Sequence, residues 1–445
     1  MLRSSARSMR EFGRNARYYL LALGLSTLVI DGVYAVIFNL YLLRLGYDPT
    51  FIGRINSAGL LTFALASMPA GMLGNHWGSR RAMLAGLWII LAGSLSLPFA
   101  GFFLPELQAT WLFLSYIAMF LGFAIFFVNG IPFLMSVTTD DQHNSAFSMQ
   151  TAIYTVFALI GGLLGGLLPG TFTGLTSIPA GDPLAYRISL WSAALLLLPA
   201  IFSALRTTQM QPQRRLKAPV GQPMTNGQWS PRRMRLARMR IGPVKRTYLL
   251  LLLAISVVRL LQVAGMAVSN TFFNVYMDQR LNVPLAQIGF LAASARLMAV
   301  PAALAMAGMA TRWGNRRLVI VAGLGTALGL LPLALIPMVG AAAIGFIGIA
   351  VSSAIRYPAF LAYSMAMVRD DQRQTMSGLS EMTAGISFAY IALLGGYLIT
   401  TVGYTALFLT GAFMVLLGTA FFVIYFRRPR GVDAQMAQAP ASIGD

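Results

Sequence analysis

The chain contains no cysteine, only two histidines and few charged residues of either sign. Without thiols, no disulfide, thiolate metal site or cysteine nucleophile can form. The histidines, His76 and His143, accompany no carboxylate cluster in an apolar run, so metal-dependent or acid–base enzyme chemistry has little support. Charged residues make up 10% of the chain, whereas 57% are hydrophobic and the mean hydropathy is +0.70. These values are typical of an integral membrane protein.

Twelve long apolar runs cover most of the chain. Each has roughly 20 residues or more, enough for a helix to cross a hydrocarbon core of about 30 Å. The runs show no alternation of period two, so spanning helices are favoured over a barrel. The predicted spans are 18–43, 50–74, 82–102, 109–136, 146–169, 186–206, 247–277, 285–311, 317–338, 341–367, 377–401 and 403–426.

Positive charge is unevenly distributed between the two sides of these spans. The net charge is +20, and 26 of the 33 lysines and arginines lie in the terminal tails or in loops on the same side as both tails. This asymmetry predicts that both termini are cytoplasmic, in a multi-pass plasma-membrane protein expected in a bacterial inner membrane. Topology thus explains the basic clusters, and no nucleic-acid partner is expected because they lack interleaved aromatic residues.

The second half of the sequence repeats features of the first. The basic turn NHWGSRR at 75–81 returns as TRWGNRR at 311–317, and FNLY at 38–41 returns as FNVY at 273–276. Further matches in the same order are Gly53 with Gly289, DDQ at 140–142 with 370–372, and GG at 165–166 with 395–396. The repeat predicts two six-helix halves of parallel topology.

The repeat and the hydropathy together predict a domain organisation with one long hydrophilic connection. A basic stretch at 231–240 within that connection is suited to lying on an anionic membrane surface. The predicted parts are a cytoplasmic tail 1–17, a first bundle 18–206, a cytoplasmic basic linker 207–246, a second bundle 247–426 and a cytoplasmic tail 427–445.

The turn GMLGNHWGSRR at 71–81 resembles the loop signature of the major facilitator superfamily, Gly-x-Leu-x-Asp followed by glycine and paired basic residues. The resemblance covers residues 18 to 426 and implies an all-α fold of twelve transmembrane helices in two pseudo-symmetric bundles. It also implies a monomer without cofactors that transports a small molecule by alternating access. Asn75 replaces the family's aspartate, so a latch made there loses a charge contribution of about 0.3–1 kcal/mol.

The duplicated turns and the acidic motifs after spans four and ten predict a cytoplasmic gate. Within each half, the paired arginines of the turn are expected to bind the paired aspartates. Glu381, in the first turn of span eleven, is placed at the same gate. The predicted gate residues are Gly71, Asn75, Gly78, Arg80, Arg81, Asp140, Asp141, Gly314, Arg316, Arg317, Asp370, Asp371 and Glu381.

Four further ionisable residues lie within spans, near the midplane. Each costs at least about 2.5–3.5 kcal/mol at a helix centre, so none is expected to face lipid. In the resembled fold, spans one, four, seven and ten line the central cavity, and the polar face of span seven adds amide side chains. The predicted substrate- or ion-binding residues are Asp31, Arg259, Gln262, Asn270, Asn274, Arg296 and Arg356.

The sequence leaves three roles open for these charges. Asp31 could lock the halves together by pairing with Arg259 or Arg356, or it could carry a coupling proton. Alternatively, the arginines could contact substrate. Because three central arginines accompany one central carboxylate, an anionic or zwitterionic substrate would supply the missing negative charge.

The predicted function is secondary active transport of a small organic solute, with the lipid bilayer and the substrate as partners. A proton-coupled efflux antiporter for hydrophobic compounds is an alternative, supported by the aromatic residues Tyr34, Phe38, Phe126 and Phe127, which are expected on the cavity side. A non-transporting sensor of the same fold is another. An ATP-driven pump is not supported, because neither lysine follows a phosphate-binding glycine-rich loop.

Overall fold

The structure is a computed structural model that describes residues 12–139, 142–176, 179, 181–208, 246–368 and 373–427. Within these ranges the regular structure is entirely helical. Twelve helical segments are long and apolar enough to cross a membrane. The twelve predicted spans are therefore confirmed.

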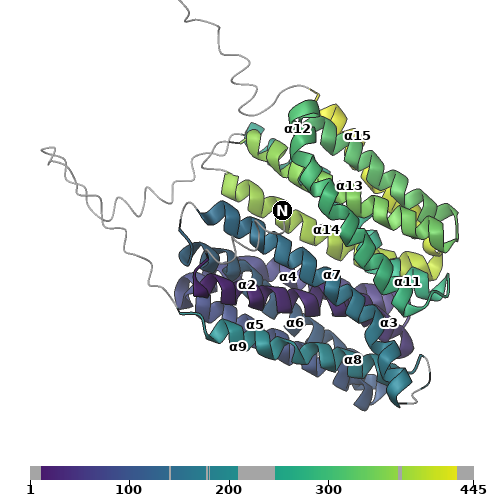
Figure 1. Cartoon of the computed structure of the whole chain (residues 1–445). Coiled ribbons are helices and arrows are strands. Elements are labelled where there is room, and N and C mark those ends of the chain that lie inside the picture. The colour runs from purple at the N-terminus through teal and green to yellow at the C-terminus, as the bar shows by residue number, and fades with distance from the viewer. Residues whose placement is uncertain are drawn as a thin grey trace, which may run out of the picture.

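The N-terminal half forms one bundle, drawn purple to teal in Figure 1. Its first span is continuous but changes helix type, from α-helix to π-helix and back. Asp48 begins the second span by accepting a hydrogen bond from the Phe51 amide, with Pro49 in the first turn. The elements are α2 (Arg14–Thr27), η1 (Leu28–Tyr34), α3 (Ala35–Arg44), α4 (Pro49–Trp77), α5 (Ser79–Ser96), η2 (Leu97–Phe102), α6 (Pro105–Ser136), α7 (His143–Thr176), α8 (Pro183–Leu195) and α9 (Leu197–Leu205).

The C-terminal half forms the second bundle, drawn green to yellow in Figure 1. Its elements are α11 (Arg246–Gln279), α12 (Leu285–Leu335), α13 (Val339–Ala366), α14 (Arg373–Thr401) and α15 (Tyr404–Tyr425). α12 contains two spans joined at a kink. We call the end of the molecule that carries the turns 75–81 and 311–317 the basic end, and the other the opposite end.

The two basic turns have the same backbone geometry. Gly78 separates α4 from α5 with φ 85° and ψ 141°, and Gly314 kinks α12 with φ 76° and ψ 150°. Positive φ is costly for a residue with a Cβ atom, so glycine is required at this corner in both halves. The sequence repeat is therefore also a structural repeat.

The first arginine of each turn binds the end of the last helix in its own half. Arg80 donates to the carbonyls of Thr207 (2.6 Å) and Leu205 (2.8 Å), beside the end of α9. Arg316 donates to the carbonyls of Phe426 (3.2 Å) and Val423 (3.3 Å), at the end of α15. Each guanidinium satisfies carbonyls that a helix terminus leaves free.

The expected acidic partners of these arginines, Asp140, Asp141, Asp370 and Asp371, lie outside the described residues. The duplicated contact that the structure does describe is thus made to backbone oxygens. Asn75 is exposed, and its amide makes no hydrogen bond to any residue in the described ranges.

Close glycine contacts join the two halves towards the opposite end. A methyl group on Gly53 of α4 would lie 3.1 Å from the Cα atom of Gly396 of α14, and one on Gly166 of α7 would lie 2.9 Å from that of Gly289 of α12. Glycine permits this approach of helix backbones. Because Gly53 matches Gly289 in the repeat and Gly166 matches Gly396, the two contacts are related by the internal symmetry.

Candidate functional site

Two asparagines, one from each half, form reciprocal hydrogen bonds that join α3 to α11 at the opposite end. Asn39 Nδ2 donates to the Thr271 carbonyl (2.8 Å), and Asn274 Nδ2 donates to the carbonyls of Val36 (3.2 Å) and Ala35 (2.9 Å). Asn39 matches Asn274 in the repeat, and Val36 matches Thr271 at the same spacing. Asn274, predicted as a substrate or ion ligand, instead uses its amide to join the halves in this state.

An ion pair that the sequence analysis missed strengthens the same closure. The Arg44 guanidinium binds the Asp278 carboxylate through two hydrogen bonds, Nη1 to Oδ2 at 2.9 Å and Nη2 to Oδ1 at 2.5 Å. Thr50 and Thr400 share a further hydrogen bond of 2.9 Å across the halves. Arg44 follows the motif 38–41 and Asp278 follows the matching motif 273–276. The repeat could therefore have indicated that the two residues lie at the same depth in the membrane.

A cluster of charged side chains lies inside the C-terminal half. Arg259 on α11 and Arg356 on α13 are 4% and 2% exposed. Arg259 Nη2 lies 3.6 Å from Glu381 Oε1 on α14, and the Tyr357 hydroxyl donates to the same oxygen at 3.1 Å. The Arg259 guanidinium also lies over the rings of Tyr357 (5.0 Å) and Phe360 (5.5 Å), a cation–π arrangement.

Arg356 has no such support. Its Nε and Nη1 atoms are buried without a hydrogen-bond partner among the described residues, as are the hydroxyl of Ser353 one turn away on α13 and the Nε atom of Arg259. Its charged neighbour in the cluster is a second cation, Arg259. Buried polar groups without partners are rare in native proteins and mark places for water, an ion or a ligand. With Glu381 as the carboxylate, the cluster has a surplus of one positive charge.

A second charged cluster connects the halves near the midplane. Asp31 lies in the π-helical segment η1, where Gly32 packs directly on Gly161 of α7. Tyr154 of α7 lies beside the Asp31 carboxylate, whose Oδ2 atom is buried without a hydrogen-bond partner among the described residues. Arg296, on α12 of the other half, donates from Nη2 to the Asp31 backbone carbonyl at 2.5 Å. A π-helix is a frequent local feature of functional sites.

The proposed lock between Asp31 and Arg259 or Arg356 is not formed. Among the described residues, Arg259 pairs with Glu381 instead, and the charged group beside Asp31 is Arg296. Glu381 was expected at the gate, but it belongs to the arginine cluster, with its side chain 53% exposed. Tyr154 and Tyr357 were not predicted, because an isolated tyrosine in an apolar span gives no sequence signal.

Several predicted cavity residues point elsewhere. Gln262 packs against Gly418 of α15, and neither of its side-chain amide atoms has a hydrogen-bond partner in the part of the chain that the structure describes. Asn270 is exposed. The Tyr34 hydroxyl donates to the Ser94 carbonyl (2.8 Å) inside the N-terminal bundle, where Phe126 is also fully buried. Two of the four aromatic residues predicted on the cavity side therefore lie in the core of the N-terminal half.

Twelve spans in two related bundles, with unpaired charge buried between and within them, define a non-enzymatic membrane transporter. The family model described as Major Facilitator Superfamily matches residues 20–261 and 255–441, and the chain belongs to this family. A search of curated proteins by sequence found no match.

Solved transporter structures share the fold. The inward-open xylose transporter XylE from E. coli is 12% identical, with a TM-score of 0.68 over 95% of this chain and 98% of that one. A bacterial homologue of the human lysosomal transporter Spinster, inward-facing and unoccupied, is 14% identical, with a TM-score of 0.66 over 98% and 99%. A POT family transporter in complex with 5-aminolevulinic acid is 14% identical, with a TM-score of 0.67 over 97% and 100%. At these identities the likeness concerns the fold alone.

Proposed function

We propose that the protein is a secondary active transporter for a small organic solute that carries a carboxylate, phosphate or similar anionic group. The observation that carries the proposal is the buried Arg356 guanidinium, which has unpartnered donors beside a second arginine. A bidentate anion would satisfy those donors and neutralise the surplus charge. A zwitterion fits as well, because the exposed carboxylate of Glu381 lies within the same cluster.

Movement of the solute would occur by rocking of the two halves. The hydrogen bonds and ion pair that join the halves in the described ranges lie at the midplane or towards the opposite end, as at Asn39, Arg44 and Arg296. At the basic end, the arginine contacts stay within each half. The state is therefore closed at the opposite end, and breaking the seam there would expose the site to the other side. Positive charge at the basic end supports its placement in the cytoplasm.

Efflux of hydrophobic compounds is the weaker alternative. A broad apolar site needs aromatic side chains on the cavity surface, and Tyr34 and Phe126 are committed to the N-terminal core. The groups left without partners in the C-terminal half are guanidinium, hydroxyl and amide atoms, which suit a polar ligand.

Transport in proteoliposomes tests the proposal. The purified protein is screened with radiolabelled anionic, zwitterionic, cationic and neutral solutes, alongside Arg356→Gln, Arg356→Lys and the control Arg280→Gln. We expect uptake of an anionic or zwitterionic class, reduced at least about tenfold by Arg356→Gln because a charge-assisted hydrogen bond contributes about 1.5–3 kcal/mol. Arg356→Lys should retain part of the uptake, since lysine keeps the charge but not the planar fork.

The control Arg280→Gln removes an exposed cation outside the cluster and should transport as the unaltered protein does. Equal transport of every anion by the unaltered protein and Arg356→Gln would refute anion recognition by this cluster. Transport restricted to neutral or cationic hydrophobic compounds would establish the alternative function.

A further inference from the structure

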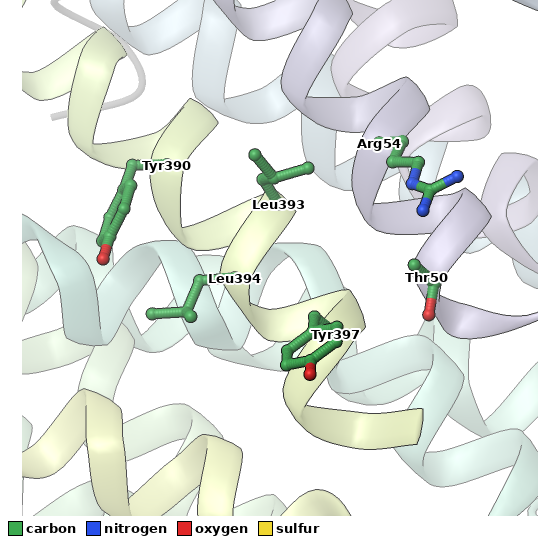
Figure 2. Close-up of a pocket in the computed structure, with 6 residues that line it drawn as sticks. All are labelled: Thr50, Arg54, Tyr390, Leu393, Leu394 and Tyr397. Atoms are coloured by element: carbon green, nitrogen blue, oxygen red, sulfur yellow. The ribbon is translucent and has the colours of Figure 1, made fainter. Parts of the chain in front are cut away.

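A groove of about 280 Å³ lies where the two halves meet at the surface, between α4 and α14 (Figure 2). α4 contributes Thr50 and Arg54, and α14 contributes Tyr390, Leu393, Leu394 and Tyr397. The groove is separate from both charged clusters, because none of the residues that line it belongs to either cluster. The two helices are joined beside the groove by the Gly53–Gly396 contact and the Thr50–Thr400 hydrogen bond of 2.9 Å.

The groove opens towards lipid. Arg54 is exposed, and the exposed positions that follow it on α4 recur at helical spacing and are all apolar: Leu61, Leu65, Met68 and Met72. On α14 the exposed positions Tyr390, Leu393 and Tyr397 form a matching stripe. A continuous exposed apolar stripe on a spanning helix faces the hydrocarbon of the bilayer.

Arg54 places one free positive charge at the rim of this apolar groove. It lies five residues after the start of α4, about 7.5 Å along the helix axis and so near headgroup depth. Its side chain makes no ion pair or hydrogen bond with any described residue, unlike Arg44 at the same end, which is paired with Asp278. Tyr397, four residues before the end of α14, adds a hydroxyl-bearing ring of the kind enriched at membrane interfaces.

We propose that this groove binds an anionic phospholipid from the leaflet at the opposite end. The lipid phosphate binds the Arg54 guanidinium, which has the donor geometry for it, and one acyl chain lies along Leu393 and Tyr390. Charge complementarity selects this occupant. The apolar walls suit the acyl chain of any lipid, but the Arg54 cation at headgroup depth favours an anionic headgroup.

The site would also bias the transport cycle. Its walls come from different halves, so the groove exists only while α4 and α14 are in contact at the opposite end. A lipid bound across the seam therefore stabilises the state closed at that end. This inference does not depend on the identity of the transported solute.

Tryptophan quenching by brominated lipids tests the site. Leu393→Trp places a reporter in the groove, and Leu409→Trp places one at a similar depth on α15, five residues after its first residue and 39% exposed. The variants are reconstituted with brominated phosphatidylglycerol or brominated phosphatidylcholine, and the signal of the native tryptophans is subtracted. We expect the groove reporter to prefer the anionic lipid roughly fivefold, the factor that corresponds to about 1 kcal/mol for one basic residue.

The preference should fall to about one when Arg54→Gln is added and persist with the matched control Arg280→Gln, an exposed arginine at the same end. Leu409→Trp should show no preference. Equal quenching of Leu393→Trp by both lipids would overturn the proposal. Displacement of the lipid by free glycerophosphate would also overturn it, because the groove would then be a site for soluble anions. Loss of quenching as the protein-to-lipid ratio rises would overturn it too, because a second copy of the chain would then occupy the groove.

Discussion

The two buried arginines of the C-terminal half differ in what surrounds each guanidinium. Arg259 faces a carboxylate and two aromatic rings, and only its Nε atom is buried without a hydrogen-bond partner among the described residues. Arg356 has two such atoms, Nε and Nη1, and no carboxylate or aromatic ring is paired with it there. Burying a charge is costly unless pairing and hydrogen bonds offset the loss of water. In the unliganded state, Arg356 therefore lowers the stability of the fold, and a bound anion removes that cost.

Removing the Arg356 charge should consequently not harm stability. We expect Arg356→Met to leave the free energy of unfolding unchanged or raise it by up to about 4 kcal/mol, as found when buried charges are replaced by apolar groups of similar volume. Arg259→Met serves as the comparison, and it should lower stability because it removes the cation–π contacts and the partner of Glu381. Thermal unfolding of the purified variants in detergent measures both. A clearly lower Tm for Arg356→Met than for Arg259→Met would contradict the assignment.

At the scale of single residues, the sequence predicted that Arg259 and Arg356 are buried but not how the charges pair. Helical spacing placed Asp31, Arg259 and Arg356 near the midplane, and hydropathy excluded lipid contact. The pairing depends on the rotation of each helix about its axis, which close contacts such as Gly32 on Gly161 determine. Those contacts join distant parts of the chain, so the Arg259–Glu381 pair was not predictable from periodicity within one span.

At the scale of elements, the first span is the most irregular. Its π-helical segment Leu28–Tyr34 surrounds Asp31 and brings a carbonyl within reach of Arg296, across the boundary between the halves. The Asp31 carboxylate faces Tyr154 on the neighbouring α7. Asp31 thus combines a protonatable side chain with a contact between the halves, which would let its protonation be coupled to their rocking.

Asp31→Asn tests that coupling. Asparagine has the shape of the protonated side chain but cannot release a proton, so we expect loss of concentrative uptake driven by a pH gradient while solute counterflow persists. Uptake and counterflow in proteoliposomes separate the two. Glu106→Gln, an exposed carboxylate at the start of α6, is the control and should concentrate solute normally. Full concentrative uptake by Asp31→Asn would exclude Asp31 as the coupling carboxylate.

The number and order of the spans were predictable, because hydropathy and length suffice to identify a helix in lipid. The π-helical segment was not, because it changes no hydropathy and its sequence is ordinary apart from Asp31. The glycine corner of each basic turn was predictable as a repeat. Its left-handed backbone at Gly78 and Gly314 explains why the glycine recurs at the same place.

At the scale of the whole molecule, the internal repeat determines the seam between the halves. Gly53 meets Gly396 and Gly166 meets Gly289, and the repeat maps the first pair onto the second. The amides of Asn39 and Asn274 are related in the same way across α3 and α11. An interface built from matched residues is self-complementary, as in a two-fold dimer. The midplane charges do not follow the repeat, so the contacts at the closed end are symmetric whereas the charged clusters are not.

The symmetry makes a quantitative prediction about closure. Asn39→Ala and Asn274→Ala should each weaken the closed opposite end by at least about 1 kcal/mol, the contribution of one hydrogen bond, and thus raise the population open at that end at least about fivefold. The double variant should open further. Because the chain contains no cysteine, spin labels can be attached at Leu104→Cys and Val402→Cys, exposed residues of different halves at the opposite end. Double electron–electron resonance then measures the fraction of long distances between the labels.

Asn129→Ala is the matched control, because this amide donates to the carbonyls of Ala70 and Ile125 within the N-terminal half. Its loss removes the same chemical group without touching the seam, so the distance distribution should stay that of the unaltered protein. If either seam variant alone reproduced the full effect of the double variant while the other had none, the two asparagines would not be equivalent. The closed end would then depend on one half, and the repeat would be a feature of sequence and backbone without a symmetric role in gating.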